Sequence, residues 1–118
     1  MSNIFSLADV LNPPHGQEFF EGILQGRGRM RVERIVSHGH TSPERGWYNQ
    51  EQDEWVLVLE GNARLLFKNG EEASLGRGEC LLIPKYSKHK VIHTSSPCIW
   101  LAIFADALEQ ERSEPKII

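Results

Sequence analysis

The chain has 118 residues, 40% of them hydrophobic and 25% charged, and a formal net charge of -3 at pH 7. This length predicts one domain with one core, and the small negative charge gives no reason to expect nucleic acid or a membrane as partner. Two cysteines are too few for a disulfide scaffold and fit a reducing compartment, so we expect a cytoplasmic protein.

Short segments rich in branched and aromatic residues predict β-strands throughout the chain. In chain order they are 19–25, 29–37, 55–59, 63–67, 80–83 and 98–104. Single helical turns are predicted over 6–11 and 106–112. Many short strands separated by turn residues indicate an all-β sandwich or barrel.

The dipeptide Asn69-Gly70 lies between two of these segments. It predicts a two-residue hairpin turn with a positive φ at both positions. In the strand before it, Ala63, Leu65 and Phe67 alternate and are expected to share one face.

A row of polar residues comes just before the apolar strand 55–59, in the stretch GWYNQEQDEWVLVLEG. Five consecutive apolar residues have no solvent face, so the polar residues before them are expected at the mouth of a buried space. Alternation puts Glu54 on the face of Val56, and Tyr48 and Gln50 on the same face if the chain stays extended.

A second polar cluster follows Pro84, in the stretch KYSKHKVIH. Alternation along a short strand places His89, Val91 and His93 on one side. Two imidazoles are therefore expected to point in the same direction.

The segment from Gly78 to His93 resembles the second conserved motif of the cupins. Gly78, Pro84 and His89 match its glycine, proline and histidine. Tyr86 stands where the motif has a glycine at a tight turn, and His93 stands where it has an asparagine.

The first cupin motif is matched less completely. Glu54 and Gly61 stand at its glutamate and glycine, with six residues between them. Tyr48 and Gln50 occupy the places of its two histidines. The resemblance covers approximately residues 29–104. We expect a single domain, 1–118, in which 1–28 form an N-terminal strand and cover segment and 105–118 form a C-terminal tail.

This resemblance implies a double-stranded β-helix, a jelly roll with its site inside the barrel. In cupins three histidines and a glutamate hold a divalent metal there, which makes Gln50, Glu54, His89 and His93 the candidate ligands and Tyr48 and Glu54 the candidate catalytic residues. An amide and a phenol in place of imidazoles would favour harder or more loosely held ions. The alternative is a hydrogen-bonded pair of Glu54 and His89 in a polar cavity without metal.

His38-Gly39-His40 is the one literal H-x-H of the chain. The turn residues TSPERG follow it, and loop histidines beside such residues are usually solvated. We therefore expect His38 and His40 to lie outside the site.

Two classes of function remain open. The first is a cupin-barrel protein that binds a small molecule, with a possible divalent metal of unknown identity and without turnover. The alternative is a metal-dependent enzyme, a dioxygenase or an isomerase, acting on a small polar metabolite. A homodimer is expected in either case, because Trp55, Leu57 and Leu59 form an apolar face opposite the proposed cavity.

Overall fold

The computed structural model describes residues 3–7 and 17–111. Within these ranges it contains eight strands and no helix, which confirms the predicted all-β class. The strands are β1 (Phe19–Gln25), β2 (Arg31–Ser37), β3 (Asp53–Glu60), β4 (Ala63–Phe67), β5 (Glu72–Leu75), β6 (Cys80–Ile83), β7 (His89–Thr94) and β8 (Cys98–Ala105).

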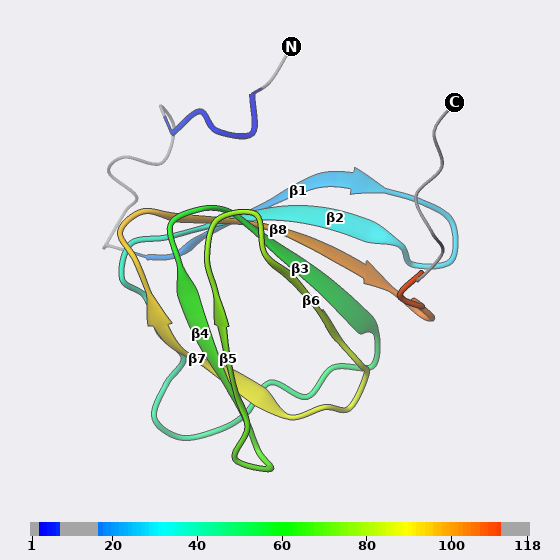
Figure 1. The fold of residues 1–118 in the computed structure, drawn as a ribbon. Helices are drawn as coiled ribbons and strands as arrows, with labels where there is room; N and C mark the ends of the chain where they lie inside the picture. The colour runs from blue at the N-terminus through cyan, green and yellow to red at the C-terminus, as the bar shows by residue number, and fades with distance from the viewer. Residues whose placement is uncertain (1–2, 8–16, 112–118) are drawn as a thin grey trace.

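The strands form two antiparallel sheets that face each other as a jelly roll (Figure 1). The larger sheet has the order β1-β2-β8-β3-β6 and the smaller one the order β5-β4-β7. An isolated bridge between Tyr48 and His89 attaches the segment before β3 to the free edge of β7. The larger sheet has two strands more than the smaller one.

The core lies between the sheets. Its most deeply buried members come mainly from alternate positions of β3, β4 and β8, with one residue from β6, namely Val56, Val58, Ala63, Leu65, Ile83, Cys98, Trp100 and Ala102. Alternation in β3 places Trp55, Leu57 and Leu59 on the outer face, where they are half-buried. The two cysteines, buried Cys98 and exposed Cys80, are not joined in a disulfide.

The outer face of β2 is covered by the N-terminal residues 3–7, which lie above β1 and β2 in Figure 1. Arg34 points outward from β2, is only 5% exposed, and donates hydrogen bonds to the backbone carbonyls of Ile4 and Ser6. Val32 and Val36 are buried on the same outward side. The alternate residues of β2 therefore face the interior of the barrel.

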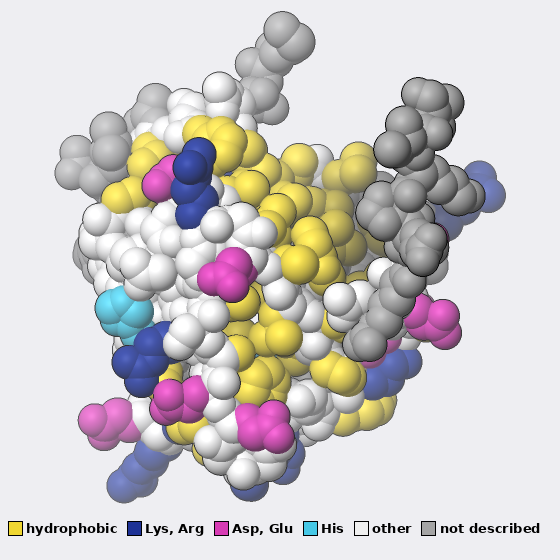
Figure 2. Space-filling view, in the orientation of Figure 1, with side chains coloured by type: hydrophobic (Ala, Val, Ile, Leu, Met, Phe, Trp, Pro, Cys, Tyr) yellow, Lys and Arg dark blue, Asp and Glu magenta, His cyan; other side chains and the backbone are white. Residues whose placement is uncertain are grey.

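Figure 2 shows apolar side chains gathered over the region of β3 and β6, with most charged side chains nearer the outline of the molecule. Within the described residues, no helix has the length and apolar character that a membrane crossing requires.

The hairpin between β4 and β5 differs from the predicted turn. Only Gly70 has a positive φ, of 96°. Phe67 accepts a hydrogen bond from Gly70 N and donates one to Glu71 O, which makes a three-residue loop that ends in a left-handed glycine. The Asn69 side chain accepts a hydrogen bond from Glu71 N, so it stabilises the turn without a positive φ of its own.

The helical turn predicted over 106–112 is wrong for residues 106–111, and Arg112 lies outside the described residues. Side-chain contacts replace it: Asp106 binds Arg29, and Leu108 N donates to the carboxylate of Asp53 at 2.8 Å. Of the other predicted turn, over 6–11, residues 6 and 7 are not helical and the rest lie outside the described residues.

Candidate functional site

A cavity of about 330 Å³ opens between the two sheets. Its apolar lining comes mainly from Ile35, Val56, Leu65, Ile83, Val91, Trp100 and Phe104. Its polar lining consists of Glu18, Arg31, Glu33, Tyr48, Gln50, Glu54 and His89. The cavity is thus an apolar pocket with several convergent polar groups, the usual character of a small-molecule site.

Glu54 is the most deeply placed carboxyl group of the pocket, with only 7% of its surface exposed. Alternation in β3 turns it inward beside Val56. Burial raises the pKa of Glu54 to about 7, and the hydrogen bond from the Gln50 amide nitrogen, at 2.9 Å, opposes part of this rise. The carboxyl group can therefore either hold or release a proton near neutral pH.

His89 faces Glu54 from β7 and is 4% exposed. Its Nδ1 lies 2.8 Å from the carbonyl oxygen of Ser87 and must donate to it, which leaves the lone pair on Nε2. This Nε2 is 3.9 Å from Glu54 Oε1, too far for a hydrogen bond. Burial lowers the pKa of His89, so the imidazole favours its neutral form and the contact is not an ion pair.

Tyr48 and Gln50 join the pocket from the extended segment before β3. Backbone hydrogen bonds between Tyr48 and His89 run in both directions, at 2.8 and 3.2 Å. Gln50 O accepts a hydrogen bond from Tyr86 N, and Tyr86 has a φ of 62°. Tyr86 thus adopts the left-handed conformation of the motif glycine it replaces and ties this turn to the polar row.

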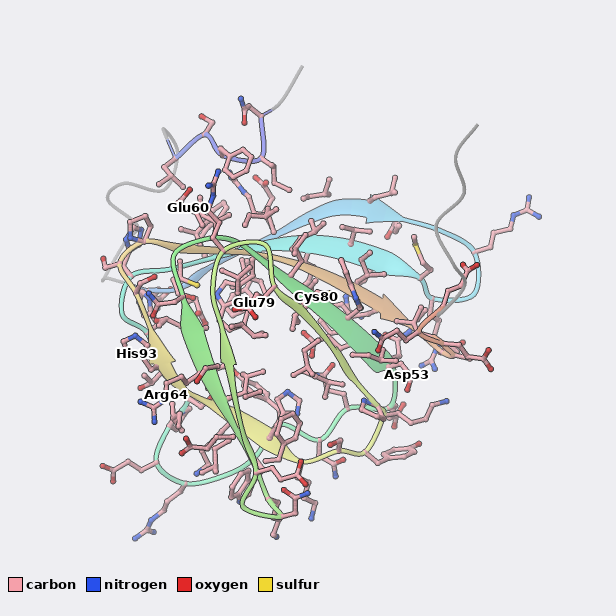
Figure 3. All side chains as sticks on the ribbon, in the orientation of Figure 1. Asp53, Glu60, Arg64, Glu79, Cys80 and His93 are labelled. Atoms are coloured by element: carbon pink, nitrogen blue, oxygen red, sulfur yellow. The ribbon has the colours of Figure 1, made fainter. Side chains whose placement is uncertain are left out.

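The structure does not bring His93 to the pocket. In the pairing of β4 with β7, Leu65 faces Val91 but Arg64 faces His93, so Ile92 is an extra residue that breaks the alternation. His93 is exposed, bonds to Asn62 at 3.0 Å, and lies beside Arg64 on the outer side of the small sheet (Figure 3). The prediction that it shares a face with His89 is wrong.

His38 and His40 are absent from the pocket lining. His38 N donates to His40 Nδ1 at 2.8 Å, and the His40 carbonyl accepts from Thr94 at 2.6 Å. Both histidines therefore take part in the loop that joins β2 to the following segment.

Three charged residues of the pocket were missed by the sequence analysis: Glu18, Arg31 and Glu33. Arg31 and Glu33 alternate with Val32 in β2. The alternation was a usable signal, but an amphipathic strand would normally turn its valines inward. Here the N-terminal residues bind Arg34 on the side of the valines, and the side with Arg31 and Glu33 enters the pocket.

The donor set does not match that of a tightly held divalent metal. Glu54 and His89 are the two strong ligands that converge, whereas catalytic zinc usually has three protein ligands. No group of three His, Cys, Asp or Glu side chains suited to a metal occurs among the described residues. Gln50 and Tyr48 offer only an amide oxygen and a phenol as additional ligands.

Comparison with known proteins agrees with the geometry. The family model described as "Cupin domain" matches residues 31–104, more than half of the chain. The chain belongs to the cupin family. Among curated proteins, none matches this cupin.

Solved structures extend the comparison. A candidate mannose-6-phosphate isomerase of Ralstonia eutropha JMP134 is 35% identical, with a TM-score of 0.79 over 91% of this cupin and 98% of that chain. A cupin superfamily protein of Desulfitobacterium hafniense DCB-2 is 18% identical, with a TM-score of 0.66 over 84% and 86%. KdgF of a Halomonas species is 13% identical, with a TM-score of 0.65 over 78% and 81%. The last two show the fold alone.

Proposed function

We propose that this cupin binds a small, partly apolar metabolite inside the barrel. The observation that carries the proposal is the 330 Å³ cavity, in which Glu54 and His89 lie buried above an apolar floor. A volume of this size lies at the lower end of the range for small-molecule pockets. Tyr48 and Gln50 provide further hydrogen-bonding groups at the polar end, and the incomplete donor set favours binding without a resident metal.

Filling the cavity tests this function. Val56→Phe places a larger side chain in the pocket, whereas Leu57→Phe, its neighbour on the outer face of β3, leaves the pocket unchanged. Binding of a panel of small acids, amides and alcohols can be measured by the NMR shift of the Trp100 indole N–H. Members of the panel should bind the native protein and Leu57→Phe but not Val56→Phe. Equal binding to all three proteins, or binding to none, would refute the proposal.

A second candidate is catalysis of proton transfer, as in an isomerase. It is favoured by the Glu54 pKa of about 7 and by the neutral His89 beside it, because a base poised near the working pH transfers protons efficiently. The Ralstonia protein is described as a candidate mannose-6-phosphate isomerase, which makes mannose 6-phosphate the first compound to test. Incubation of mannose 6-phosphate in deuterated water tests this, with deuterium uptake next to the carbonyl expected from the native protein and none from Glu54→Gln.

A homodimer is part of the proposal. Trp55, Leu57 and Leu59 keep partly exposed apolar side chains on the outer face of β3. The edge strand β1 adds Ile23 and Leu24, which are 47% and 59% exposed. Burial of such a surface against a second copy would be favourable by about 25 cal/mol per Å² of apolar area. A cytoplasmic location fits the two free cysteines.

A further inference from the structure

Arg31 occupies a central position at the polar end of the pocket. Cross-strand pairing places it beside Phe104 of β8, and the same Phe104 pairs on its other side with Glu54 of β3. All three side chains line the cavity. The guanidinium carbon of Arg31 lies 4.0 Å from the centre of the Phe104 ring, so the cation stacks on the ring that lies between Arg31 and Glu54 in the sheet pairing.

The guanidinium group is held in place before any ligand arrives. Its Nη1 donates to Gln52 Oε1 at 3.0 Å and its Nε to Glu33 Oε2 at 3.3 Å. Gln52 is itself buried and donates to the carbonyl of Arg29 and to Asp106, at 3.0 and 3.3 Å. A side chain fixed in this way loses little entropy when it binds a further group.

Arg31 also keeps unused donors. A guanidinium has five N–H groups, and the two hydrogen bonds found within the described residues leave three for a ligand. No hydrogen bond from Nη2 is found in that part of the chain. The Arg31 side chain is 46% exposed, so a ligand that enters from solvent can reach these donors.

The surrounding charges limit which anion can bind. Glu18 accepts a hydrogen bond from Ser37, Glu33 pairs with Arg31, and the Glu54 pKa of about 7 leaves it partly protonated near neutral pH. His89 is neutral. Glu33 already compensates the charge of Arg31, so a carboxylate ligand has to compete with Glu33 for the guanidinium. A monoanion meets less repulsion from the carboxyl groups of the pocket than a doubly charged phosphate does.

We propose that Arg31 determines the specificity of the pocket and selects a small monocarboxylic acid with an apolar body. The planar guanidinium matches a carboxylate with two parallel hydrogen bonds. The apolar part of the ligand then rests on Val56, Ile35 and Trp100. This inference rests on the proposed binding function and adds the chemical class of the ligand.

Paired probes of equal shape test the proposal at pH 7.5, with binding followed by NMR of the Trp100 indole N–H. Benzoate should bind at least about tenfold more tightly than benzamide, its neutral counterpart, and more tightly than phenyl phosphate, a dianion. In Arg31→Gln the ratio of benzoate to benzamide affinity should fall to within about twofold. The control Arg64→Gln removes an arginine that pairs with Glu72 outside the pocket, and should keep the ratio.

Glu33→Gln should change benzoate affinity in the opposite direction from Arg31→Gln, which separates an effect on recognition from an effect on folding. Removal of this competing carboxylate should raise benzoate affinity and leave benzamide affinity unchanged. If Glu33 had only a structural role, the substitution would lower the affinity for both probes. Equal affinities of benzoate and benzamide in the native protein would overturn the inference while leaving the proposed binding function intact. Absence of binding by every probe would overturn both.

Discussion

The buried carboxyl group of Glu54 makes the folded protein less stable as the pH rises. Its pKa increases from 4.5 to about 7 because burial disfavours the charged form. A pKa difference of roughly 2.5 corresponds to about 3 kcal/mol of unfolding free energy. Between pH 4.5 and 7 the folded state retains the proton and the unfolded chain does not, so stability falls through this window and the full loss is present above it.

The substitution Glu54→Gln should remove this dependence, because the neutral amide resembles the protonated carboxyl group and can still accept the hydrogen bond from Gln50. Relative to the native protein, the variant should gain about 3 kcal/mol between pH 4.5 and pH 8. His89 contributes in the opposite direction, since its lowered pKa means that stability is lost as the pH falls. Comparison of the two proteins at each pH largely removes that contribution.

Urea unfolding at pH 4.5, 6 and 8 measures the difference, and carbon NMR of the Glu54 carboxyl group reports its pKa directly. Glu51→Gln is the matched control, because the Glu51 side chain is 77% exposed and has no burial cost to relieve. A difference in unfolding free energy between Glu54→Gln and the native protein that stays constant with pH would contradict a raised pKa of Glu54. So would titration of the Glu54 carboxyl group near 4.5.

Three further predictions concern the turns, the histidines and the assembly. Gly61→Ala should destabilise the fold by about 1 to 2 kcal/mol more than Gly78→Ala in thermal unfolding. Both glycines have φ near 80°, so the backbone cost is shared, but an added Cβ at Gly61 would meet Ser95 Oγ and lie 2.5 Å from Pro97 O. Weak binding of added Zn²⁺, measured by calorimetry, should be lost in His89→Ala. It should be unchanged in the double variant His38→Ala, His40→Ala and in His93→Ala, and an equal loss of Zn²⁺ binding in these variants would place the site elsewhere. Sedimentation at micromolar concentration should give twice 13.5 kDa, about 27 kDa, and 13.5 kDa would exclude the dimer.

The sequence was sufficient to predict the convergence of Glu54 and His89. Both lie at positions where motif spacing and strand alternation agree, and the structure brings their side chains to one pocket. His93 could not be placed in the same way, because a β-bulge at Ile92 shifts the alternation by one residue. A bulge has no reliable sequence signal in a stretch such as HKVIHT, so every residue beyond it is assigned to the wrong face.

The missed residues of β2 have a different cause. The pattern RVERIVS allows either face to point inward, and the choice depends on what covers the other face. The decisive contact is Arg34 with the carbonyls of Ile4 and Ser6, about thirty residues earlier in the chain. Local periodicity has no information about such a contact. Arg31 and Glu33 were therefore not recognised as pocket residues.

The unequal sizes of the two sheets explain why a pocket exists at this end of the barrel. The smaller sheet has three strands and covers the inner face of β3 and β8, where the side chains are apolar and buried. β1 and β2 form one edge of the larger sheet, and apolar side chains on an inner face without cover would be exposed to water. Arg31 and Glu33 tolerate that exposure. Under the proposed function, this edge of the larger sheet admits the ligand, and Arg31 and Glu33 line the entrance and select it.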